Sequence, residues 1–199
     1  MRKTYTSPLR ALLVLFALII LSIPQTSLGE VALKDADIRH FIAAIKPLDK
    51  LGKKYALDQD KDMMSQTMDG EFNPMSQSLK RIRKHEAYGE FKHIIQKAGF
   101  SSDEEWAMVG DRVMKAFIAL KMKKEMQHQP GQGGVGELEE SLKQIENNQH
   151  ISSEMKERLL KQIKQSIIMI KSVSNSSPAD QNALRPHMDN LNTQFKDVE

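Results

Sequence analysis

The chain of 199 residues has no cysteine. This absence excludes disulfide scaffolds, thiolate zinc sites, iron–sulfur clusters, cysteine nucleophiles and a lipid-modified N-terminal cysteine. Aromatic residues are scarce, with seven Phe, three Tyr and one Trp, whereas there are 12 methionines. Methionine is therefore the unusual feature of the composition.

Acidic residues are absent from the first 29 positions. This segment has basic residues first, then an apolar run, and small residues at the expected cleavage site. The basic residues are Arg2, Lys3 and Arg10, the run is Ala11–Ile23, and Ser27 and Gly29 occupy positions −3 and −1 before Glu30. This order is typical of a secretory signal peptide. The run is shorter than the about 20 apolar residues that cross a bilayer. We therefore expect residues 1–29 to be a cleaved signal peptide rather than an uncleaved membrane anchor.

The formal net charge of +3 comes entirely from this segment, because residues 30–199 contain 26 basic and 26 acidic residues. Two basic clusters, at 80–84 and 121–124, lie on predicted helices beside acidic neighbours. The balance gives no support for a polyanionic partner, so we do not expect nucleic-acid binding. An exported chain without cysteine is more typical of the bacterial periplasm than of eukaryotic secretion. We expect a periplasmic or secreted protein.

Apolar residues recur at steps of three and four along most of the remaining chain, which predicts helices. No segment shows the sustained alternation of a strand, so we predict an all-α fold. The first predicted helix spans 38–55, and Pro47 should kink or restart it. Residues 58–74 follow as a loop, and a second helix is predicted over 75–98.

The corner after this second helix has the strongest local signal. Gly99 suits the left-handed conformation that ends helices. Ser101 or Ser102 can cap a third helix together with a glutamate three residues later. We expect this third helix to end near Gln127.

The segment 129–136 holds four of the ten glycines and predicts a flexible linker. A short helix over 138–145, a longer one starting at Ser152 or Ser153, and a last one starting at Ser177 with a kink at Pro186 should follow it. We therefore predict a helical bundle, or two helical hairpins joined by the linker, with an N-terminal region over 30–128 and a C-terminal region over 137–199.

The stretch 159–173 carries an apolar stripe that becomes apolar on every side at 167–170. A small three-helix unit cannot bury all of this surface. We expect the remainder to contact the N-terminal region, a second copy of the chain, a client protein or a membrane surface. The predicted partner-binding residues are Ile163, Ile167, Ile168, Met169 and Ile170.

The loop before the second helix contains two weak metal-binding patterns. Asp58, Asp60, Asp62 and Asp69 have the spacing of EF-hand calcium ligands, but Met63 replaces the required glycine and Asp69 replaces the bidentate glutamate. Met63, Met64 and Met68 form a thioether cluster, which suits Cu(I). Methionine also lines adaptable binding surfaces.

Two Glu-x-x-His patterns match a di-iron motif of four-helix bundles. They are Glu90 with His93 and Glu125 with His128. In a helical hairpin they would lie about 30 Å apart along the axis, so we do not expect a di-iron site.

Common catalytic motifs are absent from the sequence, including Gly-x-Ser-x-Gly, His-Glu-x-x-His, the phosphate loop and the dinucleotide fingerprint. We therefore expect a non-catalytic protein without a cofactor that binds a protein or hydrophobic segment, in a chaperone-like or envelope-associated role. The alternative is a periplasmic metal-binding protein that uses copper at the methionines or calcium at the acidic loop.

Overall fold

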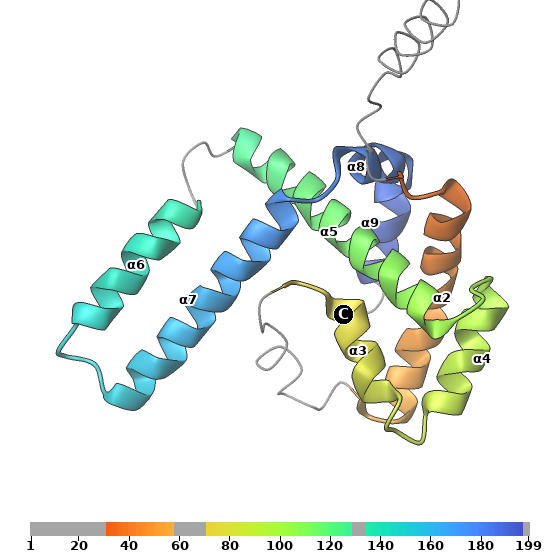
Figure 1. The fold of residues 1–199 in the computed structure, drawn as a ribbon, viewed down its shortest axis with the longest axis horizontal. Coiled ribbons are helices and arrows are strands. Elements are labelled where there is room, and N and C mark those ends of the chain that lie inside the picture. Colours follow the sequence, from red (N-terminus) through yellow and green to blue (C-terminus); the bar gives the residue numbers. More distant parts are fainter. Residues whose placement is uncertain (1–30, 58–70, 129–133, 197–199) are drawn as a thin grey trace, which may run out of the picture. The chain divides into compact units, whose positions relative to one another are not determined.

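The computed structural model describes residues 31–57, 71–128 and 134–196, and the secondary structure in these ranges is helical (Figure 1). The predicted all-α fold is confirmed. The predicted signal peptide lies outside the described residues. The helices are α2 (Asp35–Lys54), α3 (Pro74–Ile82), α4 (Tyr88–Ala98), α5 (Asp103–His128), α6 (Val135–Asn147), α7 (Ser153–Ser174), α8 (Pro178–Leu184) and α9 (Met188–Lys196), with the 3₁₀ turn η3 (Arg185–His187) before α9.

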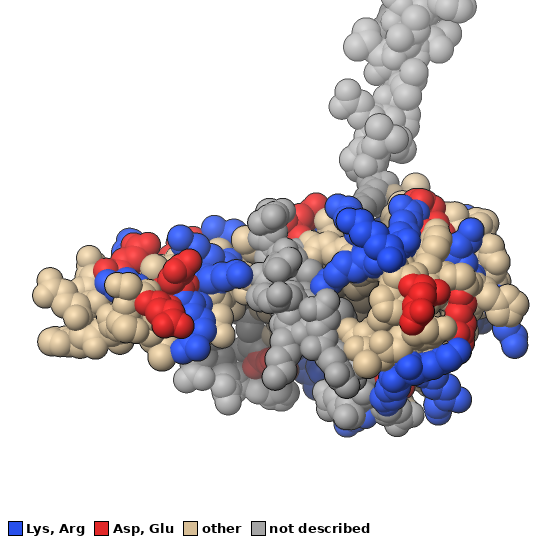
Figure 2. Space-filling model, turned by 90° about the horizontal axis from the view of Figure 1, so that it is seen from below, with Lys and Arg blue, Asp and Glu red and all other residues tan. Residues whose placement is uncertain are grey.

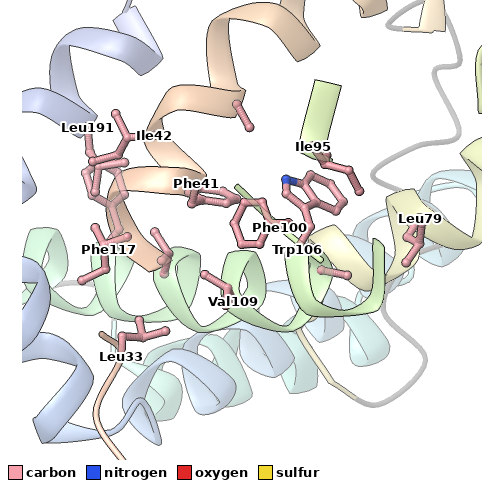
Figure 3. Close-up of a cluster of buried hydrophobic side chains, with 14 of the residues drawn as sticks. Leu33, Phe41, Ile42, Leu79, Ile95, Phe100, Trp106, Val109, Phe117 and Leu191 are labelled. Carbon is pink, nitrogen blue, oxygen red and sulfur yellow. The ribbon is translucent and has the colours of Figure 1, made fainter. Parts of the chain in front are cut away.

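The central element of the hydrophobic core is α5, which packs against α2, α3, α4 and α8. A helix with neighbours on several sides buries a wide band of its surface. In α5 this band includes Trp106, Val109, Val113 and Phe117 (Figure 3). Burying one such side chain contributes about 1.5–3 kcal/mol, so these residues make a substantial contribution to the stability of the bundle.

The C-terminal helices α8 and α9 belong to the same core. Leu184 and Leu191 are fully buried, with 0% of their surface exposed. The ring of Phe195 lies 5.1 Å from that of Phe117. The chain therefore leaves the bundle after α5 and returns to it after α7. Of the two predicted arrangements, the single bundle describes all helices except α6 and α7.

A partly buried ion pair holds this return in place. Asp180 at the start of α8 accepts hydrogen bonds from Arg112 Nε at 2.8 Å and Nη2 at 2.6 Å. Its carboxylate also accepts the backbone N–H of Leu33 at 2.8 Å. Charge-assisted bidentate pairs are among the strongest side-chain contacts. The carboxylate thereby joins α8, α5 and the segment before α2.

Gly110 permits the close crossing of three helices. A Cβ atom at this position would lie 2.7 Å from Phe41 of α2 and 2.6 Å from Met75 of α3. These separations are shorter than any ordinary van der Waals contact. The hydrogen side chain of glycine therefore lets α2 and α3 both approach α5.

The predicted corner between α4 and α5 is confirmed. Gly99 ends α4 with φ of 111°. The hydroxyl of Ser102 accepts the N–H of Glu105 at 3.0 Å, and the Glu105 carboxylate accepts the N–H of Ser101 at 2.8 Å. The first bond makes Ser102 the capping serine, and Glu105 reaches back to the residue before it, a variant of the capping box.

The predicted continuous helix over 75–98 is wrong, because residues 83–87 form a turn between α3 and α4. The ring of His85 accepts the N–H of Ala87 at 3.1 Å, which satisfies a donor that a continuous helix would have paired. Arg83 in this turn reaches Asp103 at 2.9 Å. The turn allows Ile82 and Phe91 to enter the core from two separate helices.

Two prolines have different effects on their helices. The helix α2 continues through Pro47 as a single element. Pro186 lies in the 3₁₀ turn between α8 and α9, where the predicted kink becomes a break between helices. The helix α6 begins at Val135, so the last residues of the predicted linker are already helical.

Candidate protein-binding surface

The helices α6 and α7 form an antiparallel hairpin (Figure 1). Ser152 starts α7, and its hydroxyl accepts the N–H of Met155 at 3.3 Å. Lys171 of α7 lies 3.1 Å from the carboxylate of Glu139 of α6. Lys156 donates to the carbonyl oxygen of Glu146 at 2.9 Å. These contacts bind the two helices to each other near both ends of the pair.

The apolar stripe of α6 is only half-buried. Its members recur at helical spacing, and α7 covers them in part while the charged residues of α6 are exposed. The helix α6, which is described in full, has no buried residue. The described helices therefore leave part of this stripe uncovered. The stripe consists of Val135, Leu138, Leu142 and Ile145.

The burial of α7 is confined to its C-terminal half. Its buried residues are Ile167 and Val173, and neither belongs to the hydrophobic core of the bundle. Leu159 and Leu160 in its N-terminal half are half-buried, and Met155 is 39% exposed. The hairpin therefore has a covered end beside the bundle and a less covered end at the loop between its helices.

The five predicted partner-binding residues differ in their burial. Ile167 is 8% exposed, whereas the other four are half-buried. The C-terminal end of α7 lies against α5 of the N-terminal region (Figure 1). The sequence reasoning did not select α6, although the spacing of Leu138, Leu142 and Ile145 was visible in the sequence.

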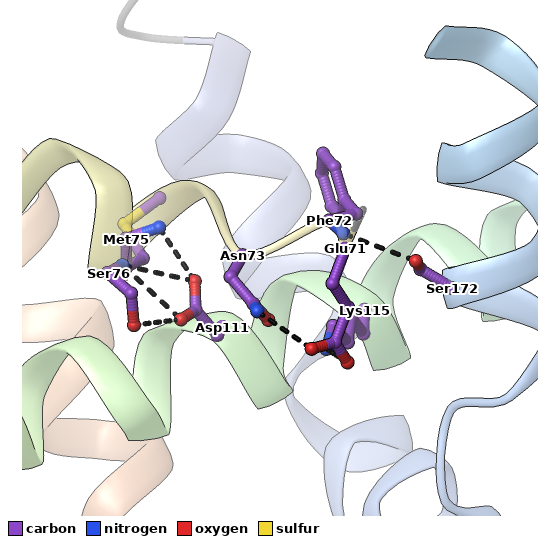
Figure 4. A network of polar contacts seen from close by, with 8 residues as sticks. All are labelled: Glu71, Phe72, Asn73, Met75, Ser76, Asp111, Lys115 and Ser172. Atoms are coloured by element: carbon purple, nitrogen blue, oxygen red, sulfur yellow. Dashed lines mark hydrogen bonds and ion pairs between the residues drawn. The ribbon is translucent and has the colours of Figure 1, made fainter. Parts of the chain in front are cut away.

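A polar junction attaches α7 to the bundle (Figure 4). The backbone N–H of Phe72 donates to the hydroxyl of Ser172 at 3.2 Å. The preceding residue, Glu71, pairs with Lys115 of α5 at 3.1 Å. This hydrogen bond from Lys115 lowers the pKa of Glu71, and a second one from Asn73 acts in the same direction. The segment 71–73 thus connects α5 to α7.

Asp111 of α5 holds the start of α3, which follows this segment. Its carboxylate accepts the N–H of Met75 at 2.7 Å and the hydroxyl of Ser76 (Figure 4). A carboxylate at a helix N-terminus is favoured by the helix dipole. Burial nevertheless raises the pKa of Asp111, against the opposing effect of the hydrogen bonds from Ser76 and Met75. Asp111 is therefore a structural anchor of the junction.

The charges of the hairpin are mixed in sign. The helix α6 carries four glutamates and one lysine, and α7 carries five basic residues and two glutamates. The net charges are therefore −3 for α6 and +3 for α7. Figure 2 shows acidic and basic side chains interspersed with uncharged surface over the hairpin, at the left of the view. On the face shown, charges of both signs are therefore mixed.

The predicted calcium and copper ligands between Asp58 and Asp69 lie outside the described residues. Within the described ranges, no three His, Asp or Glu side chains are grouped closely enough to hold a metal ion. Glu90 instead pairs with Lys54 at 2.7 Å, and this hydrogen bond lowers the pKa of Glu90. His93 is exposed on α4.

A hollow of about 470 Å³ lies between α2 and α9. Lys46 and Lys50 line one wall, and Asn190 and Gln194 line the other. The residues that line it include neither a carboxylate nor a histidine, so it presents no acid–base pair for catalysis. Among the helices of the described ranges, none is both long and apolar enough to cross a bilayer.

The chain matches no known protein family, no curated protein and no solved structure. The assignment of the candidate surface therefore rests on the geometry of the hairpin alone. That geometry consists of a two-helix layer with a half-buried apolar stripe, joined to a well-packed bundle by α7.

Proposed function

We propose that the protein is an exported, non-catalytic binding protein that acts in the periplasm, and that the α6–α7 hairpin is the surface that binds an apolar helix or hydrophobic segment of a partner protein. The observation that carries this proposal is the absence of any buried residue in α6. An amphipathic helix that lies in a groove between two helices is a common mode of recognition. The half-buried stripe supplies the apolar floor that such a segment needs.

Methionine supports the same proposal. Met155, at the loop end of the hairpin, is 39% exposed. The flexible, polarizable thioether adapts to different apolar partners, and for this reason methionine is frequent on surfaces that bind several partners. The bundle provides a stable base for this surface, because its core is complete without α6 and α7.

The test is suppression of aggregation of a denatured protein such as reduced insulin, together with binding of a hydrophobic dye. Leu142→Glu and Ile163→Glu place a charge in the half-buried stripe, and we expect each to reduce both activities. The matched control is Met108→Glu, which makes the same kind of change at a residue of α5 that is 57% exposed and outside the hairpin. We expect this variant to behave like the unaltered chain.

Amide exchange with and without the test protein gives a readout that needs no variant. We expect the bound test protein to slow exchange in α6 and in the first half of α7. A chain that neither binds the dye nor suppresses aggregation contradicts the proposal. Equal losses in the hairpin variants and in the Met108 control would place the binding surface elsewhere.

A further inference from the structure

The hollow between α2 and α9 has an apolar floor, to which Ile42, Ala43 and Pro47 of α2 contribute. Ala43 and Pro47 are four residues apart, so they lie one above the other on the same face of the helix. Both are exposed, and neither has a long side chain that would fill the space in front of α9. The hollow of about 470 Å³ falls in the size range of small-ligand sites.

Two pairs of polar side chains form the walls, and each pair has the same spacing of four residues. Lys46 and Lys50 belong to α2, and Asn190 and Gln194 belong to α9. Within the described ranges, none of these four side chains has a hydrogen bond or an ion pair. Asp49, the carboxylate between the two lysines in the sequence, forms its ion pair with a third lysine at 3.0 Å. The ammonium and amide groups around the hollow are therefore available to a ligand.

The backbone adds a hydrogen-bond acceptor to the floor. In an α-helix the carbonyl oxygen of Ala43 would accept the N–H of residue 47, but Pro47 has no N–H to donate. This carbonyl group belongs to a residue that lines the hollow, and a ligand N–H can supply the missing donor. The hollow thus combines cationic donors, amide groups and a backbone acceptor with an apolar floor.

We propose that this hollow binds the carboxyl-terminal end of a peptide whose last side chain is apolar. The two lysines match the carboxylate. The side-chain amides of Asn190 and Gln194 each have a donor and an acceptor, as a peptide group has. Capture of a C-terminal carboxylate is a recurring mode of peptide recognition. The inference is independent of the proposed function, because the hollow lies in the bundle and outside the α6–α7 hairpin.

Other anions match only part of this arrangement. Inorganic phosphate would use the lysines but not the apolar floor. A fatty acid would use the lysines and the floor but would leave the amides without partners, which costs binding free energy. A bilayer of anionic lipid attracts exposed lysines wherever they lie and does not need a hollow. A peptide end uses the floor and both walls at once.

The test is binding of N-acetyl-alanyl-leucine to the purified protein, followed by heteronuclear NMR. We expect saturable shifts of the amide signals around residues 42–50 and 190–194. The same dipeptide with a C-terminal amide has no negative charge, and we expect it to bind at least about tenfold more weakly. Equal binding of the acid and the amide would overturn the inference.

The two lysines are tested by a double variant with a matched control. Lys46→Met with Lys50→Met removes both charges but keeps long, flexible side chains, and we expect at least about a tenfold loss of affinity for the dipeptide. Lys80→Met with Lys84→Met is the control, because these lysines are also four residues apart, exposed and outside the hollow. This control should bind like the unaltered chain. Equal losses in both variants would assign the binding to overall charge and overturn the site.

The floor is tested without a change of charge. Ala43→Leu fills the hollow, and we expect it to abolish dipeptide binding. Ala43 is exposed, so this variant should keep its fold, which far-UV circular dichroism checks. Unchanged binding by the Leu variant would overturn the assignment to this hollow.

Competing ligands decide between a peptide and the other anions. Octanoate that binds as tightly as the dipeptide would overturn the inference in favour of a lipid acyl chain. Phosphatidylglycerol vesicles that bind the protein through Lys46 and Lys50 would do so in favour of a membrane surface. Leu142→Glu in the hairpin should leave dipeptide binding unchanged, so the failure of this inference and the failure of the proposed function are distinguishable.

Discussion

The bundle and the hairpin contain helices with similar local signals but different burial. The helix α5 has apolar residues at helical spacing and a capping box, and α2, α3, α4 and α8 surround it. The helix α7 also has a serine cap and an apolar stripe, yet its burial is limited to its end beside α5. Burial in this protein depends on the number of neighbouring helices, because each neighbour covers only one side of a stripe.

This difference assigns separate roles to the two regions. The bundle includes the helices on both sides of the hairpin in the sequence, so it gives the hairpin a stable base at its two ends. The hairpin gains less stability from its own packing. Regions with few buried apolar contacts open locally at lower free energy than core helices.

The largest expected effect is a difference in stability between two side-chain truncations, one in the bundle and one in the hairpin. Phe91 of α4 is 4% exposed, and its ring lies 5.0 Å from that of Trp106. We expect Phe91→Ala to cost about 3–5 kcal/mol, because it leaves a cavity in the core. Leu142→Ala in α6 should cost at most about 1 kcal/mol, since this side chain is only half-buried. Urea unfolding followed by circular dichroism measures both, and equal costs would contradict the distinction between the regions.

Gly110 tests the packing density of the bundle. We expect Gly110→Ala to destabilise the protein by about 1–3 kcal/mol, because the new methyl group would overlap Phe41 and Met75. Gly52→Ala in α2 is the matched control, since nothing lies within 4 Å of a Cβ atom there. Alanine also favours helix formation, so the control should be neutral or stabilising. Similar midpoints for the two variants in urea would show that the crossing at Gly110 tolerates a side chain.

The pH dependence of the free energy of unfolding should arise in part from Asp103 at the corner before α5. Burial acts to raise the pKa of Asp103, but hydrogen bonds from Tyr88 at 2.8 Å and Arg83 at 2.9 Å outweigh it and hold the pKa below the ordinary 3.8. A lowered pKa in the folded state means that the carboxylate stabilises the fold above pH 3.8. This contribution is lost as the pH falls from there through the lowered value.

The test is the urea midpoint as a function of pH. We expect Asp103→Asn to cost about 1–2 kcal/mol at neutral pH, where it removes bonds to a charged acceptor, and to flatten the decline in acid. Asp111 should act with the opposite sign. Its raised pKa favours the folded state at low pH, and this contribution disappears as the pH rises through the raised value. An unchanged acid slope in the Asp103 variant would contradict this assignment.

The smallest expected effect is at the junction between the two regions. Ser172→Ala removes the acceptor for the N–H of Phe72, and we expect a cost of at most about 1 kcal/mol in global stability. Amide exchange should be more sensitive. We expect faster exchange at the C-terminal end of α7 with little change in α5. Uniform acceleration in both helices would indicate that the hairpin and the bundle unfold as one unit.

Several features of the fold could be predicted from local patterns. Gly99 with Ser101 or Ser102 predicted the corner before α5, and Ser152 or Ser153 predicted the start of α7, because caps and left-handed glycines act within a few residues. The break between α3 and α4 also had a signal: the apolar stripe skips from Ile82 to Tyr88, a gap of six positions that fits no helix face. The gap was visible, but the prediction joined the two helices.

The candidate protein-binding surface was predictable only in part. The apolar stretch of α7 was evident in the sequence, and it includes Ile163 and Ile170. The sequence could not show that the C-terminal end of α7 is covered by the bundle while the stripe of α6 is only half-buried. Coverage depends on which helices meet in space, and helical periodicity contains no information about the partner of a stripe.

By itself the sequence determined the helical class, the caps and most helix ends of this protein, because these depend on interactions between residues three or four positions apart. The tertiary structure decided that α8 and α9 return to the core of α2–α5, where Leu184 and Leu191 are fully buried and Asp180 binds Arg112. It also decided that α6 has no buried residue. Both outcomes depend on contacts between distant segments, since the same apolar stripe can be buried by any neighbour of suitable shape.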